Sequence, residues 1–115
     1  LKLMDWINLD NDTALTKAIE NSHLNKGIVI FKHSTRCSIS SVAKSRLSLK
    51  WDFNKELPTY YLDLIKHRDI SDLIAKKFDI MHESPQLLII EKGKCIYNAS
   101  HLGISVNNIK SFLQE

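Results

Sequence analysis

Two short apolar runs constrain the fold of this chain most strongly: GIVIF at residues 27–31 and LLII at residues 87–90. Neither run alternates apolar with polar residues, and this pattern is typical of strands that are covered on both faces of a sheet. A chain of 115 residues has room for one core of this kind. We therefore expect one domain over residues 1–115, with helices packed on both sides of a sheet.

The segments around these runs alternate between strand and helix patterns. Three have the composition of strands, at residues 4–9, 58–65 and 95–99, the last after a predicted hairpin turn. Four carry apolar residues at helical spacing, at residues 12–22, 38–50, 70–78 and 106–113. We expect Asp12 and Ser105 to cap the first and last of these helices. The resulting β-α-β-α-β-α-β-β-α order predicts an α/β fold with a central mixed β-sheet flanked by helices on both faces.

Charge and composition narrow the class of protein. The net charge is +3 and 25% of residues are charged, with both signs interspersed, so neither nucleic acid nor a membrane surface is expected as a partner. No apolar run reaches the ~18–20 residues of a membrane span. Two cysteines are too few for a secreted disulfide scaffold, and we expect a cytoplasmic protein.

One of the two cysteines, Cys37, lies between the first apolar run and a predicted helix. If the helix begins at or just after it, free backbone N–H groups and the helix dipole favour a thiolate there. Arg36, Lys32 and His33 would add positive charge, and such surroundings lower a thiol pKa from ~8.5 to ~3.5–7.5. Free cysteines are often small buried residues, but the polar neighbours of Cys37 favour a reactive, accessible thiol.

The order of elements, with a cysteine after the first long strand, resembles the thioredoxin superfamily. Pro85 precedes the second apolar run, where thioredoxin-like proteins hold a cis-proline opposite the active cysteine. The resemblance therefore implies a cis bond between Ser84 and Pro85. It also implies that the backbone of Ser84 stays unpaired with the sheet and can pair with the backbone of a thiol-containing partner.

Three segments, KHSTRCSIS, ESPQLLII and NASH, resemble the monothiol bacilliredoxin family of thioredoxin-like proteins. Arg36 and Ser38 replace the threonine and proline that the family usually carries beside the cysteine, and the other motif residues match: Lys32, His33, Ser34, Cys37, Ile39 and Ser40. The resemblance implies an enzyme that takes bacillithiol, or a similar low-molecular-weight thiol, off S-thiolated proteins through a mixed disulfide on Cys37. That thiol would be a co-substrate, and no tightly bound cofactor is expected.

Ser40 stands where a dithiol redox protein carries its second, resolving cysteine. Its hydroxyl cannot resolve a mixed disulfide but could donate a hydrogen bond to the Cys37 thiolate, so we expect Arg36, Ser38 and Ser40 to stabilise that thiolate. An external thiol or a partner oxidoreductase would then release the adduct. The residues expected to bind substrate are Lys32, His33, Thr35, Ser84, Pro85 and His101, the last beside a helix start that could receive the malate of bacillithiol.

Cys95 follows the predicted hairpin turn, and we expect it at the far end of the sheet. A strand of six residues covers ~20 Å, whereas a disulfide needs Cα atoms within ~7 Å. Cys95 is therefore expected to be structural, and the histidines and cysteines have no spacing typical of a metal site. Two alternatives stay open: an iron–sulfur carrier that uses Cys37 and an external thiol, and a non-catalytic thioredoxin-like interaction module.

Overall fold

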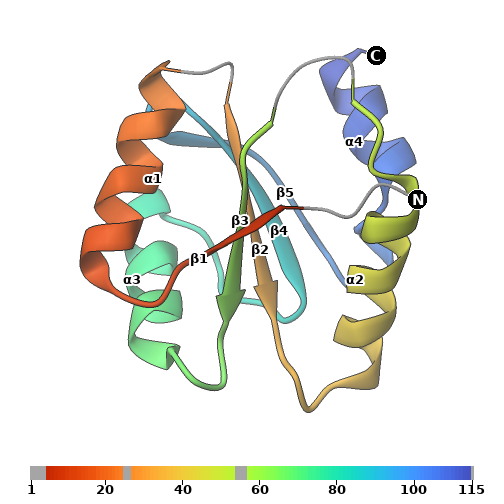
Figure 1. Cartoon of the computed structure of the whole chain (residues 1–115), viewed down its shortest axis with the longest axis horizontal. Coiled ribbons are helices and arrows are strands. Elements are labelled where there is room, and N and C mark those ends of the chain that lie inside the picture. The colour runs from red at the N-terminus through yellow and green to blue at the C-terminus, as the bar shows by residue number, and fades with distance from the viewer. Residues whose placement is uncertain (1–4, 25–26, 54–56, 115) are drawn as a thin grey trace.

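Five strands form one mixed sheet in the order β1-β3-β2-β4-β5 (Figure 1) in the computed structural model, which describes residues 5–24, 27–53 and 57–114. The strands are β1 (Trp6–Asn8), β2 (Ile28–His33), β3 (Thr59–Asp63), β4 (Gln86–Glu91) and β5 (Lys94–Ser100). β3 runs parallel to both β1 and β2, whereas β4 is antiparallel to β2 and to β5. The parallel part of the sheet comes from βα units, and the antiparallel part ends in the predicted hairpin.

Four α-helices cover the two faces of this sheet: α1 (Asp12–Leu24), α2 (Ser38–Lys50), α3 (Arg68–Phe78) and α4 (Val106–Leu113). Figure 1 shows α1 and α3 on one side of the sheet and α2 and α4 on the other. A short 3₁₀ turn, η1 (His101–Gly103), connects β5 to α4. The predicted α/β fold, with helices on both faces of a mixed sheet, is confirmed.

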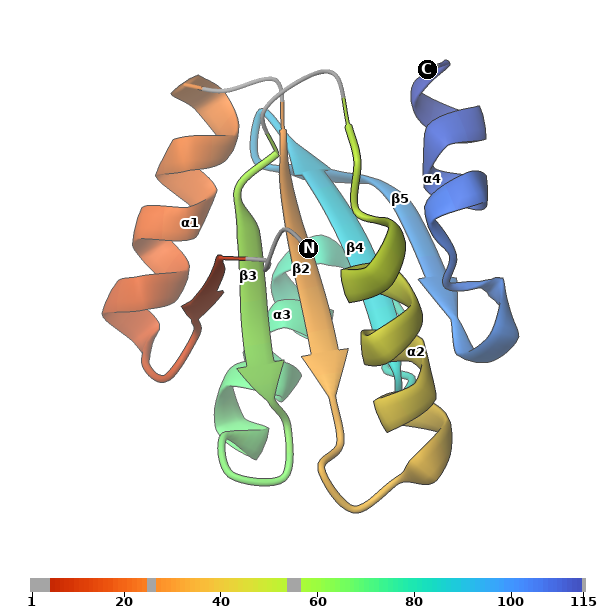
Figure 2. The same ribbon diagram turned by 45° about the vertical axis from the view of Figure 1, so that its right-hand side comes forward.

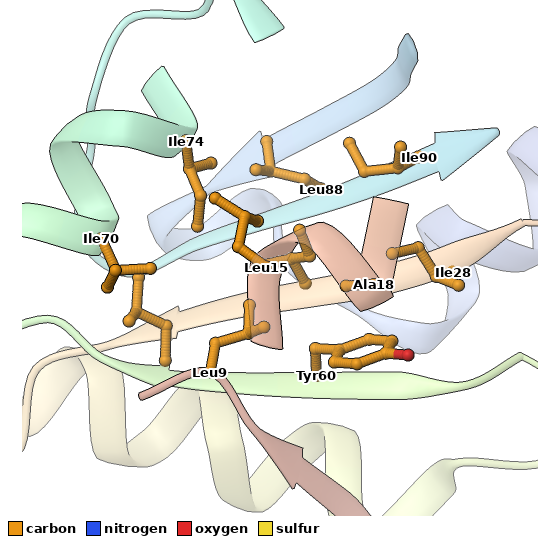
Figure 3. Close-up of a cluster of buried hydrophobic side chains, with 11 residues drawn as sticks. Leu9, Leu15, Ala18, Ile28, Tyr60, Ile70, Ile74, Leu88 and Ile90 are labelled. Atoms are coloured by element: carbon orange, nitrogen blue, oxygen red, sulfur yellow. The ribbon is translucent and has the colours of Figure 1, made fainter. Parts of the chain in front are cut away.

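The core between the sheet and the α1 and α3 helices is built from aliphatic side chains and the aromatic ring of Tyr60 (Figure 3). Ile28 and Ile30 of β2 and Leu88 and Ile90 of β4 point to this side, because every second residue of a strand faces the same way. The helices contribute further buried residues, among them Leu15, Ala18, Ile70 and Ile74. Burial of each large aliphatic side chain stabilises the fold by roughly 1.5–3 kcal/mol.

A second core lies between the sheet and the α2 and α4 helices. The intervening residues of β2, Val29 and Phe31, point to this side and pack with buried residues of the two helices: Ala43, Leu47, Val106 and Ile109. All six residues of β2 are buried; the unbroken apolar run predicts this for the first four. The strand that leads to Cys37 is therefore held rigidly from both faces.

Two helix ends differ from the sequence prediction. Asp12 is the first helical residue of α1 rather than its cap, because Asn11 Oδ1 accepts the backbone N–H of Ala14 at 2.8 Å. The same helix continues to Leu24, two residues beyond the predicted end. The prediction for α4 is confirmed, since the Ser105 hydroxyl accepts the backbone N–H of Asn108 at 3.0 Å.

The β2 strand is longer than predicted. The apolar run ends at residue 31, but β2 continues to His33 because β3 remains paired with it, Lys32 opposite Leu62 and His33 opposite Asp63. These two polar residues therefore lie inside the sheet rather than in the loop before Cys37. β1 and β3 are shorter than the predicted strands, and residue 4 of the first lies outside the described residues.

The hairpin between β4 and β5 turns at Lys92 and Gly93. Both have positive φ angles, 52° and 76°, which is the type I′ geometry that matches the twist of two antiparallel strands. The turn was predicted at this place, and its glycine supplies a backbone conformation that other residues adopt at a cost.

Candidate active site

Cys37 is the N-cap residue of α2, with φ −110° and ψ 121°. Its backbone N–H donates to the carbonyl of Ser34 at 3.1 Å, and its own carbonyl accepts the N–H of Ser41 at 3.1 Å. The thiol is free and partly exposed. The prediction that a helix begins directly after Cys37 is confirmed, and the first turn of α2 carries no acidic residue that would oppose a thiolate.

The Ser40 hydroxyl ties together the two ends of the loop that carries Cys37. Ser40 is fully buried; its Oγ accepts the backbone N–H of Ser34 at 3.0 Å and lies 2.6 Å from Nδ1 of His33. These bonds fix the start of α2 against the end of β2. The expected contact between this hydroxyl and the Cys37 thiolate stays a prediction.

His33 is a buried part of this loop support. Its ring lies 5.8 Å from the ring of Phe31 and 5.6 Å from that of Tyr61. Burial, followed by the nearby Lys44, lowers the pKa of His33 below 6.5, so the ring is largely neutral at neutral pH. The prediction that His33 adds positive charge beside Cys37 is therefore wrong at neutral pH, and the residue instead supports Ser40.

The position of the Lys32 side chain differs most from the sequence prediction. Its side chain is fully buried, at 0% exposure, and its Nζ lies 3.1 Å from Nδ1 of His82 on the side of the sheet covered by α3. Burial lowers the pKa of Lys32 to about 8. The prediction that Lys32 binds substrate directly is wrong, because alternation along β2 points its side chain away from the α2 face.

Ser84 and Pro85 form the second part of the site. The bond between them is cis, as predicted. The next residue, Gln86, pairs with Lys32 of β2, so the bend lies at the end of the sheet where the Cys37 loop begins. Figure 2 shows the ends of β2 and β3 and the start of α2 together at this lower end. Ser84 Oγ is buried with no hydrogen-bond partner in the described part of the chain.

His101 adjoins this bend. Its backbone N–H donates to the carbonyl of Pro85 at 3.2 Å, and its φ angle is 53°. The side chain is exposed, as are those of Thr35, Arg36 and Ser38 around Cys37. The structure thus brings these four residues to the surface at the Cys37 end of the sheet, while their roles toward thiol and substrate stay predictions.

Exposed apolar side chains also surround Cys37. Ile39 and Val42 of α2 are 50% and 55% exposed, and Leu102 of η1, which contacts α2, is 80% exposed. Their exposure was not predicted, because helical spacing alone places Ile39 and Val42 on the same face as Ala43 and Leu47. Helical spacing does not reveal the difference, because the narrower buried stripe of Ser40, Ala43 and Leu47 depends on how α2 packs on the sheet.

Cys95 lies at the opposite end of the sheet. It pairs with Ile90, which pairs with Ile28 at the start of β2, whereas Cys37 follows the end of β2. Six strand residues at ~3.3 Å each separate the two ends, well beyond the reach of a disulfide. Burial raises the pKa of the Cys95 thiol, and its Sγ donates to the carbonyl of Tyr97 at 3.4 Å. The predicted structural role fits this environment.

The described residues, 5–24, 27–53 and 57–114, contain neither a group of metal ligands nor a helix that could cross a membrane. No three histidine, cysteine, aspartate or glutamate side chains there are grouped as metal ligands would be. In the same part of the chain no helix has both the length and the apolar character needed to cross a membrane.

The sequence of residues 7–109 matches the family model of the monothiol bacilliredoxin BrxC. The chain belongs to the monothiol bacilliredoxin family. Among solved structures it is similar to an oxidoreductase with a thioredoxin fold, at 32% identity and a TM-score of 0.77, over 95% of this chain and 93% of the other. The family and this likeness identify a thiol oxidoreductase.

More distant structures share the fold alone. A thioredoxin from Trypanosoma brucei brucei superposes with a TM-score of 0.76 at 8% identity, over 99% of this chain and 96% of the other. A thioredoxin from Nicotiana alata gives a TM-score of 0.75 at 14% identity, over 99% and 94% of the two chains. The fold of this bacilliredoxin is that of the thioredoxins.

Proposed function

We propose that this bacilliredoxin removes bacillithiol from S-bacillithiolated proteins. The Cys37 thiolate attacks the bacillithiol sulfur of the mixed disulfide on the client protein. The bond between the client sulfur and bacillithiol breaks, a new disulfide forms between Cys37 and bacillithiol, and the client leaves as a thiolate that takes up a proton. A second free thiol, from bacillithiol or from a partner oxidoreductase, then releases the adduct from Cys37.

The observation that carries this proposal is that Cys37 is a partly exposed thiol with no second thiol near it, in a chain of the monothiol bacilliredoxin family. Cys37 caps α2 with a partly exposed thiol, while a buried hydroxyl, that of Ser40, stands three residues later where a resolving thiol would be. Cys95 is at the other end of the sheet. Such a protein can accept a small thiol but has no second thiol within reach to expel it, which supports a monothiol mechanism.

The surface around Cys37 supports a protein as the client. Ile39 and Val42 of α2 and Leu102 of η1, which contacts α2, expose apolar surface near Cys37, and we propose that the Ser84 backbone in the cis bend pairs with the client. We propose that a client segment lies across these residues. The exposed side chains of Thr35 and His101 are proposed to contact bacillithiol itself, with His101 near its malate.

The proposal is tested on a purified client protein with one S-bacillithiolated cysteine, with free bacillithiol supplied for turnover. Loss of the bacillithiol mass from the client is followed for the parent and for two variants, Cys37→Ser and Cys95→Ala. We expect Cys37→Ser to be inactive, because a hydroxyl is not ionised at neutral pH, and Cys95→Ala to be nearly as active as the parent.

An S-glutathionylated form of the same client serves as the control for the identity of the thiol. Faster removal of bacillithiol than of glutathione supports the proposed substrate. Equal activity of Cys37→Ser and the parent, or failure of the parent to act on either client, would contradict the proposal.

A further inference from the structure

Lys32 is buried and forms no ion pair with a carboxylate of the described residues, although the charge of Asp72 acts on it and partly opposes the effect of burial on its pKa. Lysines are almost never fully buried unless they are paired, and yet its side chain has 0% exposure and no ion pair within the described residues. The hydrogen bond of its ammonium group goes to Nδ1 of His82, at 3.1 Å. The proposed mechanism gives neither residue a chemical step, so another reason for this arrangement is needed.

The pair joins three parts of the molecule. Lys32 belongs to β2, five residues before Cys37, and His82 lies in the segment that connects α3 to β4, two residues before Ser84. The hydroxyl of Ser71 on α3 also lies 3.2 Å from Nδ1 of His82. The segment that ends in the Ser84–Pro85 bend is therefore tied both to the strand that leads to Cys37 and to α3.

Gln86 supports the same segment through its side chain. Its Nε2 donates to the carbonyl of Met81 at 3.0 Å, and its Oε1 accepts the backbone N–H of Glu83 at 3.3 Å. Gln86 is buried and pairs with Lys32 across the sheet, so both side chains lie on the same face. Gln86 braces the segment internally, whereas Lys32 attaches it to β2.

The proton positions in this pair follow from the chemistry of the two groups. An ammonium group only donates hydrogen bonds, so Nδ1 of His82 must accept and its proton must sit on Nε2. Partial burial of the ring first, then the charges of Lys32 and Arg68, lower the pKa of His82, against the opposing charges of Asp72 and Glu83. His82 is thus neutral at neutral pH and can accept, whereas acid would place two cations side by side.

We propose that Lys32 and His82 are positioning residues that hold the Ser84–Pro85 bend against the end of β2, beside Cys37. The bend presents the backbone of Ser84 to the client, so its position sets how well the client docks. The identity of the client rests on the proposed function, but the position of the bend can be measured without any substrate.

Amide hydrogen exchange tests the tie directly in Lys32→Met and His82→Phe. We expect exchange at residues 81–84, where the Glu83 amide donates to Gln86 Oε1, to become about tenfold faster in both, the equivalent of one lost hydrogen bond to a charged group, while exchange at residues 28–31 becomes no faster. His82→Asn, whose Oδ1 can take the place of Nδ1, should restore slow exchange. Lys77→Met, on the exposed side of α3, is the matched control and should behave as the parent does.

Kinetics on the S-bacillithiolated client then separate docking from chemistry. We expect the KM to rise about five- to tenfold in Lys32→Met and His82→Phe, with kcat and the rate of Cys37 alkylation by iodoacetamide unchanged. Recovery of the KM in His82→Asn supports a positioning role. A fall in kcat or in alkylation at unchanged KM would overturn it.

The other possible results of these experiments also decide whether Lys32 and His82 position the bend. Unchanged exchange at residues 81–84 in both variants overturns the proposed tie, and faster exchange with an unchanged KM overturns its role in docking. Circular dichroism checks that each variant folds. Because His82 is exposed, His82→Phe should fold. A His82→Phe protein that fails to fold would overturn the proposal in favour of a purely structural role. If the parent is inactive on the client, the proposed function fails, while hydrogen exchange still decides whether Lys32 holds the bend.

Discussion

Replacement of Lys32 by methionine should make this bacilliredoxin more stable at neutral pH. Burial lowers the pKa of Lys32 from 10.5 to about 8, and each pKa unit corresponds to about 1.4 kcal/mol, so the charged form is disfavoured by up to about 3 kcal/mol. Methionine fills a similar volume without charge. The lost hydrogen bond to His82, which is a bond to a charged group, costs about 1.5 kcal/mol and leaves His82 with its contact to Ser71. The net gain in the free energy of unfolding should be about 1–2 kcal/mol.

The pH dependence of stability gives the same test a second readout. The unfolded chain keeps the Lys32 proton up to pH 10.5, whereas the folded protein loses it from about pH 8. Between these values the unfolded state binds more protons, so the contribution of Lys32 to stability rises with pH through this window. Lys32→Met lacks this contribution, and its advantage over the parent should shrink as the pH is raised.

Urea unfolding followed by circular dichroism measures both effects for the parent, for Lys32→Met and for the surface control Lys77→Met. The three proteins are compared near pH 7 and near pH 10, inside the expected window. We expect Lys32→Met alone to be more stable near pH 7 and to lose that advantage near pH 10. A Lys32→Met protein that is less stable than the parent near pH 7, or that has the same pH dependence, would refute the reasoning.

Three smaller changes test the local structure. Ser40→Ala removes the acceptor of the buried N–H of Ser34, and thermal unfolding should show a loss of about 1–3 kcal/mol. Ser40→Cys puts a thiol in the resolving position, and mass spectrometry after mild oxidation should find it joined to Cys37 by a disulfide. Asn11→Ala removes the cap of α1 and should cost about 1 kcal/mol in urea unfolding, more than Asp12→Ala; the reverse order would contradict the capping assignment.

The fold was predictable because its determinants are local or periodic. The unbroken apolar runs at residues 27–31 and 87–90 identify strands that are buried on both faces, and helical spacing between the strands requires helices on either side. Even the turn at Gly93 follows from its residue type. The order of the strands was not predictable, because every pairing in the sheet except the β4–β5 hairpin joins segments that are far apart in sequence, through crossovers that no local pattern encodes.

The site was predictable in its chemistry and less so in its geometry. Cys37 and the Ser84–Pro85 bend follow from sequence and resemblance. Cys37 lies between a strand and a helix, and Pro85 directly precedes a strand. Lys32 and His33 were misread as surface residues because their polarity ends the apolar run. Pairing with β3 extends the strand through them, and their alternation then sends one side chain to each face of the sheet. Strand pairing thus decides where these two side chains lie, although their polarity alone predicts a surface position.

The exposure of Ile39 and Val42 was missed for a related reason. Helical spacing tells which side chains share a face, but the width of the buried stripe depends on how α2 lies on the sheet, and this is a property of the packed structure. The buried polar residue Ser40 occupies the centre of that stripe near Cys37, so the apolar residues beside it are turned outward to the surface around the thiol.

The central claim is that Cys37 acts alone, and mass spectrometry of the oxidised protein tests it most directly. The parent is treated with the disulfide form of bacillithiol, and intact mass and peptide maps are recorded without reduction. The account predicts one bacillithiol adduct per chain, on Cys37, formed with release of one bacillithiol, and a free Cys95. An internal disulfide between Cys37 and Cys95, or an adduct that forms on Cys95 instead, would contradict it.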